Sequence, residues 1–152
     1  MEDAAYMRRA LELAAQAAQE GEVPVGAVVV WEDGQIVGEG RNRREVGKTA
    51  LAHAELEAIA QACRKLGGWR LHKATLYVTL EPCPMCAGAV VNARIQRVVF
   101  GARDPKAGCF GSVCDFGGMA FNHHPVVEGG VLEAECAGQL KEFFRALRAR
   151  RG

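Results

Sequence analysis

The hydrophobic positions near the start of the chain predict one helix followed by a two-stranded hairpin. Apolar residues recur every three to four positions over residues 2–19, which is the spacing of an amphipathic helix, and Gly21 is a suitable stop. A β-branched run follows at 25–31, and an apolar pattern returns at 35–40. The Asp-Gly pair at 33–34 is the signal of a tight turn between two strands.

The rest of the chain alternates helical and strand patterns. An irregular basic loop leads into the first of them, and the segment 101–122 is rich in glycine and shows no period. The order of elements predicts a three-layer α/β/α fold, with a mixed five-stranded sheet covered by helices on both faces. With no internal repeat and no linker, residues 1–152 are expected to form a single domain. The further elements expected are helices at 53–65, 85–93 and 132–148, and strands at 75–80, 97–100 and 126–127.

The composition is that of an ordinary soluble protein. Hydrophobic residues make up 49% and charged residues 24% of the 152 positions, and no apolar run reaches the ~20 residues of a membrane helix. The first residues, Met1 to Asp3, lack the basic and apolar regions of a signal peptide. We therefore expect a cytoplasmic protein with no membrane partner, whose six cysteines stay reduced.

Two short segments together form a pattern that predicts a catalytic metal. One residue separates His53 from Glu55, and Cys83 and Cys86 follow, with a proline on each side of Cys83. An imidazole and two thiolates suit Zn²⁺, and three protein ligands leave its fourth tetrahedral position open for water. A carboxylate beside that water can act as general acid and base without being a ligand. His-x-Glu with a later Pro-Cys-x-x-Cys is the known signature of zinc-dependent deaminases.

The predicted helices explain how ligands so far apart in sequence can meet. Cys83 and Cys86 are three residues apart, so they are neighbours on one face of a first helical turn. The free N–H groups and positive dipole of a helix start also favour thiolate over thiol. His53 and Glu55 are two positions apart, so they do not share a face of a regular helix. Both can reach one site only if they lie in the first turn of the helix and the site lies beyond its start. We expect two helix starts to converge on one metal at the end of the sheet.

The Cys-x-x-Cys pair also occurs in structural zinc sites and in redox sites. A structural zinc normally has four protein ligands, and the other cysteines form no second pair at this spacing. Redox chemistry would need neither His53 nor Glu55. A hydrolytic zinc is therefore the favoured interpretation. The remaining cysteines are Cys63, Cys109, Cys114 and Cys136.

Basic residues gather at three places although the net charge is only +1. Local basic patches on a nearly neutral protein indicate a polyanion bound at one site. For the C-terminal group, a solvated helix end that complements the helix dipole is an equal alternative. The groups are Arg41, Arg43, Arg44 and Lys48; Arg103 and Lys106; and Lys141, Arg145, Arg148, Arg150 and Arg151.

From residue 23 to residue 145, the chain resembles the bacterial tRNA-specific adenosine deaminases, a family with the cytidine deaminase-like fold. The most specific stretches are TLYVTLEPCPMCAGA at 75–89 and VVFGARD at 98–104. The resemblance implies hydrolytic deamination of the wobble adenosine (position 34) in the anticodon stem-loop of tRNA, by a homodimer with one zinc per subunit. Many relatives have Asp-Pro-Thr just before Ala-His-Ala-Glu, where this chain has Thr-Ala-Leu at 49–51.

The resemblance also implies roles for individual residues. It places zinc on His53, Cys83 and Cys86, and the proton shuttle on Glu55. That carboxyl takes a proton from the zinc-bound water, whose hydroxide attacks C6 of adenine, and delivers protons to the ring nitrogen and the departing ammonia. Without the resemblance, Asn42 would be interpreted as a turn residue. The expected substrate contacts are Asn42, Ala54, Arg103, Asp104, Lys106, Arg145 and Arg148.

Three rival functions remain open. A deaminase of free guanine, cytosine or a nucleotide shares the metal pattern, so that pattern does not exclude it. The deaminase domain of riboflavin biosynthesis is less favoured, because a longer insert usually separates its second and third ligands. A non-enzymatic RNA-binding zinc module would not need Glu55 or an open coordination position. The segment 101–112 and the basic C-terminal helix favour tRNA, because an enzyme for a small molecule needs neither.

Overall fold

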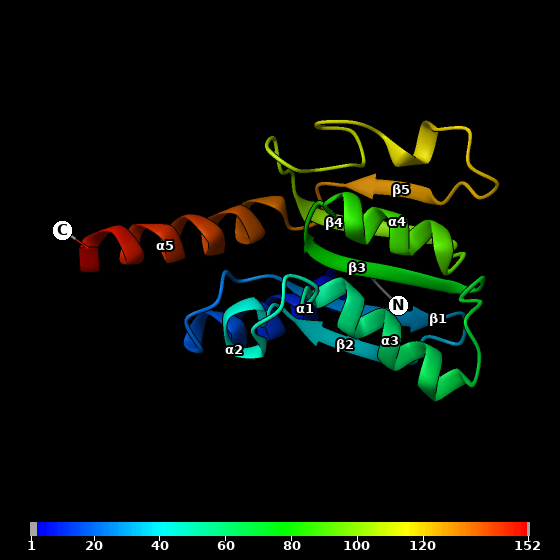
Figure 1. The fold of residues 1–152 in the computed structure, drawn as a ribbon, viewed down its shortest axis with the longest axis horizontal. Helices are drawn as coiled ribbons and strands as arrows, with labels where there is room; N and C mark the ends of the chain where they lie inside the picture. The colour runs from blue at the N-terminus through cyan, green and yellow to red at the C-terminus, as the bar shows by residue number, and fades with distance from the viewer. Residues whose placement is uncertain (1–2, 152) are drawn as a thin grey trace.

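The computed structural model describes residues 3–151, and Figure 1 shows a central sheet with helices packed along it. The sheet holds five strands and is mixed, so the predicted α/β architecture is confirmed. The elements are α1 (Asp3–Gln19), β1 (Gly26–Trp31), β2 (Ile36–Arg41), α2 (Arg44–Gly47), α3 (Ala54–Leu66), β3 (Ala74–Leu80), α4 (Pro84–Asn92), β4 (Arg97–Ala102), the 3₁₀ turn η1 (Phe116–Gly118), β5 (Val126–Gly129) and α5 (Glu133–Arg151).

The strand order brings three loops to one edge of the sheet. The strands lie in the order β2-β1-β3-β4-β5. β1 is antiparallel to both β2 and β3, while β3, β4 and β5 are parallel. β2, β3 and β4 therefore run in the same direction, and their carboxyl ends meet at the left-hand edge in Figure 1. Ligand sites of open α/β sheets form at such edges.

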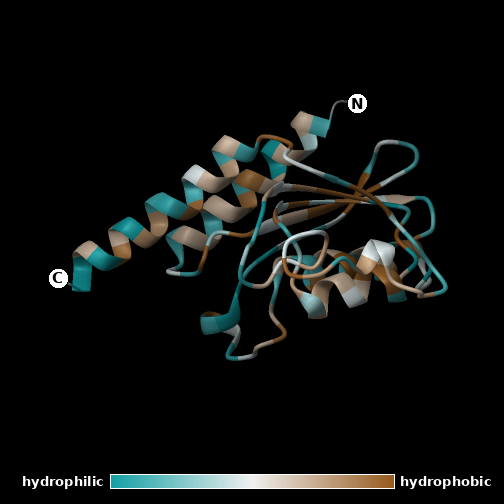
Figure 2. Cartoon of the chain, turned by 90° about the horizontal axis from the view of Figure 1, so that it is seen from above, coloured by the Kyte–Doolittle hydropathy of each residue, from teal (hydrophilic) through white to brown (hydrophobic). Residues whose placement is uncertain are grey.

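Helices cover both faces of the sheet, as the three-layer prediction required. On one face, α3 and α4 bury Ala58 and Val90 with Leu76 of β3. On the other, α1 and α5 cover the sheet, and Met7 packs in the same cluster as Tyr77. Figure 2 shows the hydrophobic strands between these two layers. Each fully buried side chain of the size of Leu76, Val90 or Met7 stabilises the fold by roughly 1.5–3 kcal/mol, so the two clusters hold the layers together.

Two strand glycines allow helices to touch the sheet backbone. A Cβ on Gly38 of β2 would lie 2.1 Å from the carbonyl oxygen of Ala58 in α3. A Cβ on Gly26 of β1 would lie 2.0 Å from the carbonyl oxygen of Ala10 in α1. No larger residue fits at either position without moving a helix. The contact at Gly38 sets how closely α3, which begins directly after His53, sits on the sheet.

The loop that follows β2 contains a helix that the sequence did not predict. Arg44–Gly47 forms the single turn α2, which has no capping side chain of its own. The Glu22 carboxylate, 1% exposed, accepts hydrogen bonds from the backbone N–H groups of Glu45 (3.1 Å) and Val46 (2.7 Å). This distant carboxylate satisfies two of the free donors of the turn, and no local pattern could have shown it.

The other differences from the expected elements are at their ends. β4 continues to Ala102, β5 to Gly129 and α5 to Arg151, and the glycine-rich segment holds the turn η1. The first expected helix begins at Asp3, and the two residues before it lie outside the described part of the chain. Among residues 3–151, no helix has the length and apolar character needed to cross a membrane.

Candidate active site

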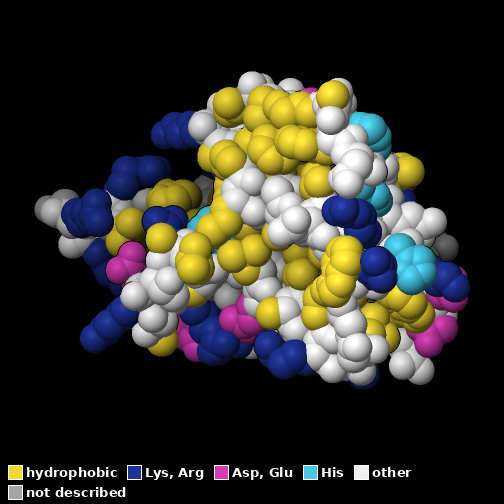
Figure 3. All heavy atoms as spheres, turned by 45° about the vertical axis from the view of Figure 1, so that its right-hand side comes forward, with side chains coloured by type: hydrophobic (Ala, Val, Ile, Leu, Met, Phe, Trp, Pro, Cys, Tyr) yellow, Lys and Arg dark blue, Asp and Glu magenta, His cyan; other side chains and the backbone are white. Residues whose placement is uncertain are grey.

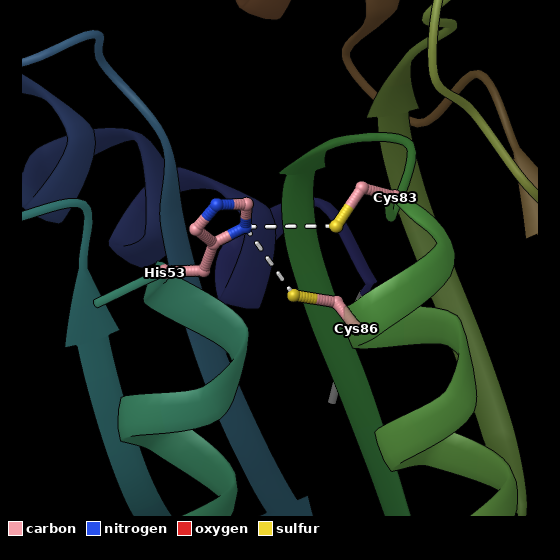
Figure 4. Close-up of side chains that lie close together, drawn as sticks. All are labelled: His53, Cys83 and Cys86. Carbon is pink, nitrogen blue, oxygen red and sulfur yellow. Dashed lines mark hydrogen bonds between the residues drawn. The ribbon is translucent and has the colours of Figure 1, made fainter. Parts of the chain in front are cut away.

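The three predicted metal ligands lie together where two helices begin. His53 is the N-cap of α3, Cys83 is the N-cap of α4, and Cys86 lies in the first turn of α4. His53 Nδ1 lies 3.6 Å from Cys83 Sγ and 3.5 Å from Cys86 Sγ (Figure 4). All three ligand atoms lie within 4.8 Å of one another. The predicted convergence of two helix starts is therefore confirmed.

The geometry of these three side chains fits a tetrahedral metal. With Zn–N and Zn–S bonds of about 2.05 and 2.3 Å, a tetrahedral ion separates nitrogen from sulfur by about 3.5 Å. The observed separations of 3.5 and 3.6 Å agree with that value. A hydrogen bond from the Cys86 thiol, assisted by His53, lowers the pKa of Cys83 to about 4, while the pKa of Cys86 is raised. The cluster thus already favours one thiolate, the form that binds metal.

The Glu55 carboxyl lies beside the triad and is almost completely buried. It belongs to the first turn of α3 and is 4% exposed. Burial raises its pKa to about 7, because the low-polarity surroundings disfavour the charged form. A carboxyl with a pKa near neutral both accepts and donates protons readily, which suits a general acid and base.

A small cleft opens onto Glu55 and onto two of the three ligands, His53 and Cys83. Its volume is about 190 Å³. Its lining comes from the segment before β1, from the start of α3, from the end of β3 and from the segments that follow β2, β3 and β4. A polymer could enter a cleft of this size only through one extruded residue. The lining residues are Val23, Val25, Asn42, Arg44, His53, Ala54, Glu55, Leu80, Glu81, Cys83, Asp104 and Ala107.

Asn42 lines the cleft and also holds the loop after β2. It is 6% exposed. Its Nδ2 donates to the Val23 carbonyl (3.1 Å), and its Oδ1 accepts from the Arg44 N–H (3.3 Å). The amide therefore orders a turn, and it also lines the cleft. Ala54, another of the expected substrate contacts, is buried in the cleft wall.

Asp104 and Arg103 follow the end of β4 but differ in their surroundings. Asp104 lines the cleft, and its Oδ1 accepts hydrogen bonds from the N–H groups of Lys106 (3.0 Å) and Ala107 (3.2 Å). That carboxylate therefore caps a turn. The Arg103 guanidinium lies over the Phe100 ring, 5.3 Å from its centre, and is not part of the cleft wall.

The basic group before His53 carries less free charge than its sequence suggests. Arg41 pairs with Glu20 and Arg43 pairs with Glu57, each at 2.9 Å. Arg44 forms no ion pair within the described residues 3–151, and it lines the cleft.

A second hollow, the cationic pocket, lies between the loop after β4 and α5. It is lined by Lys106, Leu140, Lys141, Phe144 and Arg148. Within residues 3–151, none of its three cations forms an ion pair. The structure thus brings together two of the expected RNA contacts.

Arg145, another expected RNA contact, does not line this pocket. It pairs instead with Glu142 at 2.6 Å on the exposed surface of α5.

Glu81 is a buried carboxylate at the site that the sequence analysis did not predict. It follows β3 directly, is 2% exposed and lines the cleft. Burial opposes its ionisation, but hydrogen bonds from Ser112 and from the backbone of the loop after β4 outweigh this and lower its pKa. The only available signal was a carboxylate placed between a buried strand and the Pro-Cys of the metal pattern.

Comparison with known proteins agrees with this site. The family described as MafB19-like deaminase matches residues 1–148. The tRNA-specific adenosine deaminase of Bacillus subtilis (strain 168) is 52% identical over 151 residues, covering 99% of this chain and 93% of that protein. A solved structure from work on A-to-I editing by tRNA:A34 deaminases superposes with a TM-score of 0.84 at 44% identity, covering 88% of this chain and 97% of its own. A guanine deaminase from Nitrosomonas europaea has a TM-score of 0.77 at 27% identity, covering 92% and 83%.

The fold, the His-Cys-Cys triad and the buried Glu55 define an enzyme of the deaminase class. The chain belongs to the MafB19-like deaminase family, and within that class it belongs with the tRNA-specific adenosine deaminases. The resemblance inferred from the sequence is therefore confirmed.

Proposed function

We propose that this protein deaminates adenosine 34 of a tRNA anticodon to inosine, using water and releasing ammonia. The observation that carries the proposal is the juxtaposition of the buried Glu55 carboxyl, the metal-binding triad and the adjoining cationic pocket. The relatives with the highest identity quoted above carry the same activity in their names. Because tRNA is a cytoplasmic substrate, we place the enzyme in the cytoplasm.

We further propose that His53, Cys83 and Cys86 hold one zinc ion per subunit. Zinc at such a site supplies Lewis acidity that makes water nucleophilic near neutral pH. Glu55 accepts the proton of the water as its oxygen bonds to C6 of adenine. The same carboxyl gives that proton to the ring nitrogen, then takes the second proton of the former water from the new hydroxyl group on C6 and passes it to the amine. The C6–N bond breaks, ammonia leaves and C6 becomes a carbonyl carbon.

Other residues of the cleft orient the base and exclude water. Adenine must leave its stack to enter, because the cleft admits a single base. Asn42 has one further N–H and one further lone pair beyond its two internal bonds, which suits a purine edge. The buried Ala54 and the apolar Val25 and Leu80 form walls against which a flat ring packs.

The cationic pocket supports the RNA part of the proposal. Lys106 and Arg148 flank the exposed Phe144 ring there, and Lys141 completes the group. Unpaired cations around an aromatic ring suit a phosphate with its neighbouring base. Arg103 and Asp104 lie on the same loop as Lys106, and we assign them contacts with nucleotides beside the target. Arg145 pairs with Glu142, so we assign it only a weaker, long-range electrostatic contribution to RNA binding.

We propose that the enzyme is a homodimer that associates through the outer face of α4. That helix contains no charged residue, although Pro84 is exposed and Met85, Gly88 and Val91 are half-buried. The nearby segment after β4 adds exposed Val113. Figure 3 shows hydrophobic side chains gathered in the upper part of the molecule, where Figure 1 places α4 and this segment. Large apolar patches of this kind mark protein interfaces.

Gly88→Lys tests the dimer, because a Cβ at this position would have open space around it within the subunit. Sedimentation equilibrium should show a dimer for the wild type and a monomer for the variant. A wild-type monomer at micromolar concentration would contradict the assignment, and so would a variant that dimerises normally.

The activity itself is tested with an unmodified anticodon stem-loop carrying A34. We expect inosine at that position, detected because reverse transcription then inserts cytosine. The matched control is the same stem-loop with G34, in which the other adenosines should stay unchanged. Inosine at several positions, or at none, would contradict the assignment of a wobble deaminase.

A further inference from the structure

Glu81 has no part in the chemistry proposed above, yet it is the centre of a hydrogen-bond network beside the site. Its Oε1 accepts from the Asp104 N–H (3.0 Å) and the Ser112 hydroxyl (2.5 Å). Its Oε2 accepts from the N–H groups of Phe110 (3.0 Å) and Ser112 (3.1 Å). All four donors come from residues 104–112, which we call the substrate loop. Within residues 3–151, no lysine or arginine forms an ion pair with this carboxylate.

The substrate loop is wrapped closely around the Glu81 side chain. A Cβ on Gly108 would lie 2.3 Å from the carboxyl carbon, so the loop backbone passes directly against the charge. The Cys109 N–H donates to the carbonyl of Pro82 (2.9 Å), the residue just before the ligand Cys83. The position of the loop is thereby fixed relative to the metal-binding helix α4.

This loop supplies one wall to each of the two hollows. Asp104 and Ala107 line the cleft that opens onto Glu55, and Lys106 lines the cationic pocket. The position of the Glu81 carboxylate therefore sets the distance between the cleft, which receives the target base, and the cationic pocket, which receives the neighbouring nucleotides. A carboxylate suits this task because it only accepts hydrogen bonds and offers lone pairs to all four donors.

We propose that Glu81 is a positioning residue for RNA recognition, which holds the substrate loop in register with the metal centre. This inference rests on the proposed function, since it assigns the loop to an RNA substrate. Glu81 acts through the loop and does not touch the reacting amine. Loss of its charge should therefore weaken productive RNA binding much more than the chemical step.

Glu81→Gln is the first test, because an amide has nearly the same shape but places an NH₂ group against backbone N–H donors. We expect KM for the A34 stem-loop to rise about tenfold or more, with kcat within about threefold of wild type, as for loss of a charge-assisted hydrogen bond. Zinc content should be unchanged. Glu39→Gln is the matched control, since Glu39 pairs with Arg9 away from the site, and its KM should stay within about twofold.

Amide hydrogen exchange gives a readout that needs no substrate. The N–H groups of Phe110 and Ser112 should exchange about tenfold faster or more in Glu81→Gln, while those of α4 keep the wild-type rate. Ser112→Ala removes only the hydrogen bond from the Ser112 hydroxyl to Glu81 and should raise KM about two- to fivefold with kcat unchanged. This second variant tests the positioning role if Glu81→Gln does not fold.

An unchanged KM in the folded variants, or a fall in kcat at constant KM, would overturn the positioning role. Failure of the proposed function would instead appear as a wild type that leaves the stem-loop unmodified, whatever the exchange rates. The two failures are therefore distinguishable.

Discussion

Replacing Glu55 with glutamine separates the catalytic role of this carboxyl from its cost to the fold. The side chain is 4% exposed, and its burial raises the pKa to about 7. Glutamine keeps the size but can neither accept nor deliver a proton at neutral pH. Because Glu55 is not a metal ligand, the triad should still bind zinc, and deamination should slow by roughly 10²–10⁴-fold.

The same change should stabilise the metal-free protein above neutral pH. The Glu55 pKa is about 7 in the folded state and 4.5 as the ordinary value, a difference worth up to about 3.4 kcal/mol at 1.36 kcal/mol per unit. The folded state binds this proton more tightly than the unfolded state, so wild-type stability falls as pH rises from 4.5 through 7. Glutamine removes that loss. The variant should melt up to about 10 °C higher at pH 8 and nearly together with wild type at pH 4.5.

Thermal melts of the chelator-treated proteins across that pH range measure the stability difference. After zinc is added back, metal analysis measures zinc binding by each protein, and inosine formation measures its deamination rate. A variant that carries full zinc and turns over within about tenfold of wild type would exclude Glu55 as the proton carrier. A melting difference that does not change with pH would mean that the carboxyl is not desolvated as the structure indicates.

Three other changes test separate parts of the structure. Cys86→Ala leaves two metal ligands, so zinc and activity should be lost together, and tight zinc in metal analysis would refute the ligand set. Neutralising Lys106 and Arg148 should weaken stem-loop binding and lower the salt slope by about two units, with little effect at saturating RNA; an unchanged slope in binding titrations would refute the contact. Gly38→Ala sets a methyl group 2.1 Å from a backbone carbonyl oxygen of α3, so denaturant unfolding should show a loss of roughly 1–3 kcal/mol, and unchanged stability would contradict that packing.

The order of elements and the metal ligands could be predicted because local patterns encode them. The three-residue spacing of Cys83 and Cys86 places both at one helix start, and the strand pattern puts His53 at the same edge of the sheet. The parallel direction of β2, β3 and β4 then brings the expected substrate residues Asn42 and Asp104 to the cleft.

Features made by partners distant in sequence could not be predicted. The turn α2 exists because Glu22, about 20 residues earlier, satisfies its N–H groups. The pairing of Arg41 with Glu20 removes charge that sequence counting left free. Glu81 organises a loop more than 20 residues later, and neither its burial nor its four donors follow a local period. Such contacts depend on the assembled sheet rather than on any one segment.

We conclude that this deaminase acts on an adenosine presented by RNA rather than on a free base. The most direct measurement is the ratio of kcat/KM for an A34 stem-loop to kcat/KM for free guanine, cytosine and adenosine, with one enzyme preparation and one ammonia assay. We expect a ratio of about 10³ or more, because the cationic pocket adds binding that a free base cannot use. Robust turnover of free guanine or cytosine, with a ratio near or below one, would contradict it and assign the chain to small-molecule deamination.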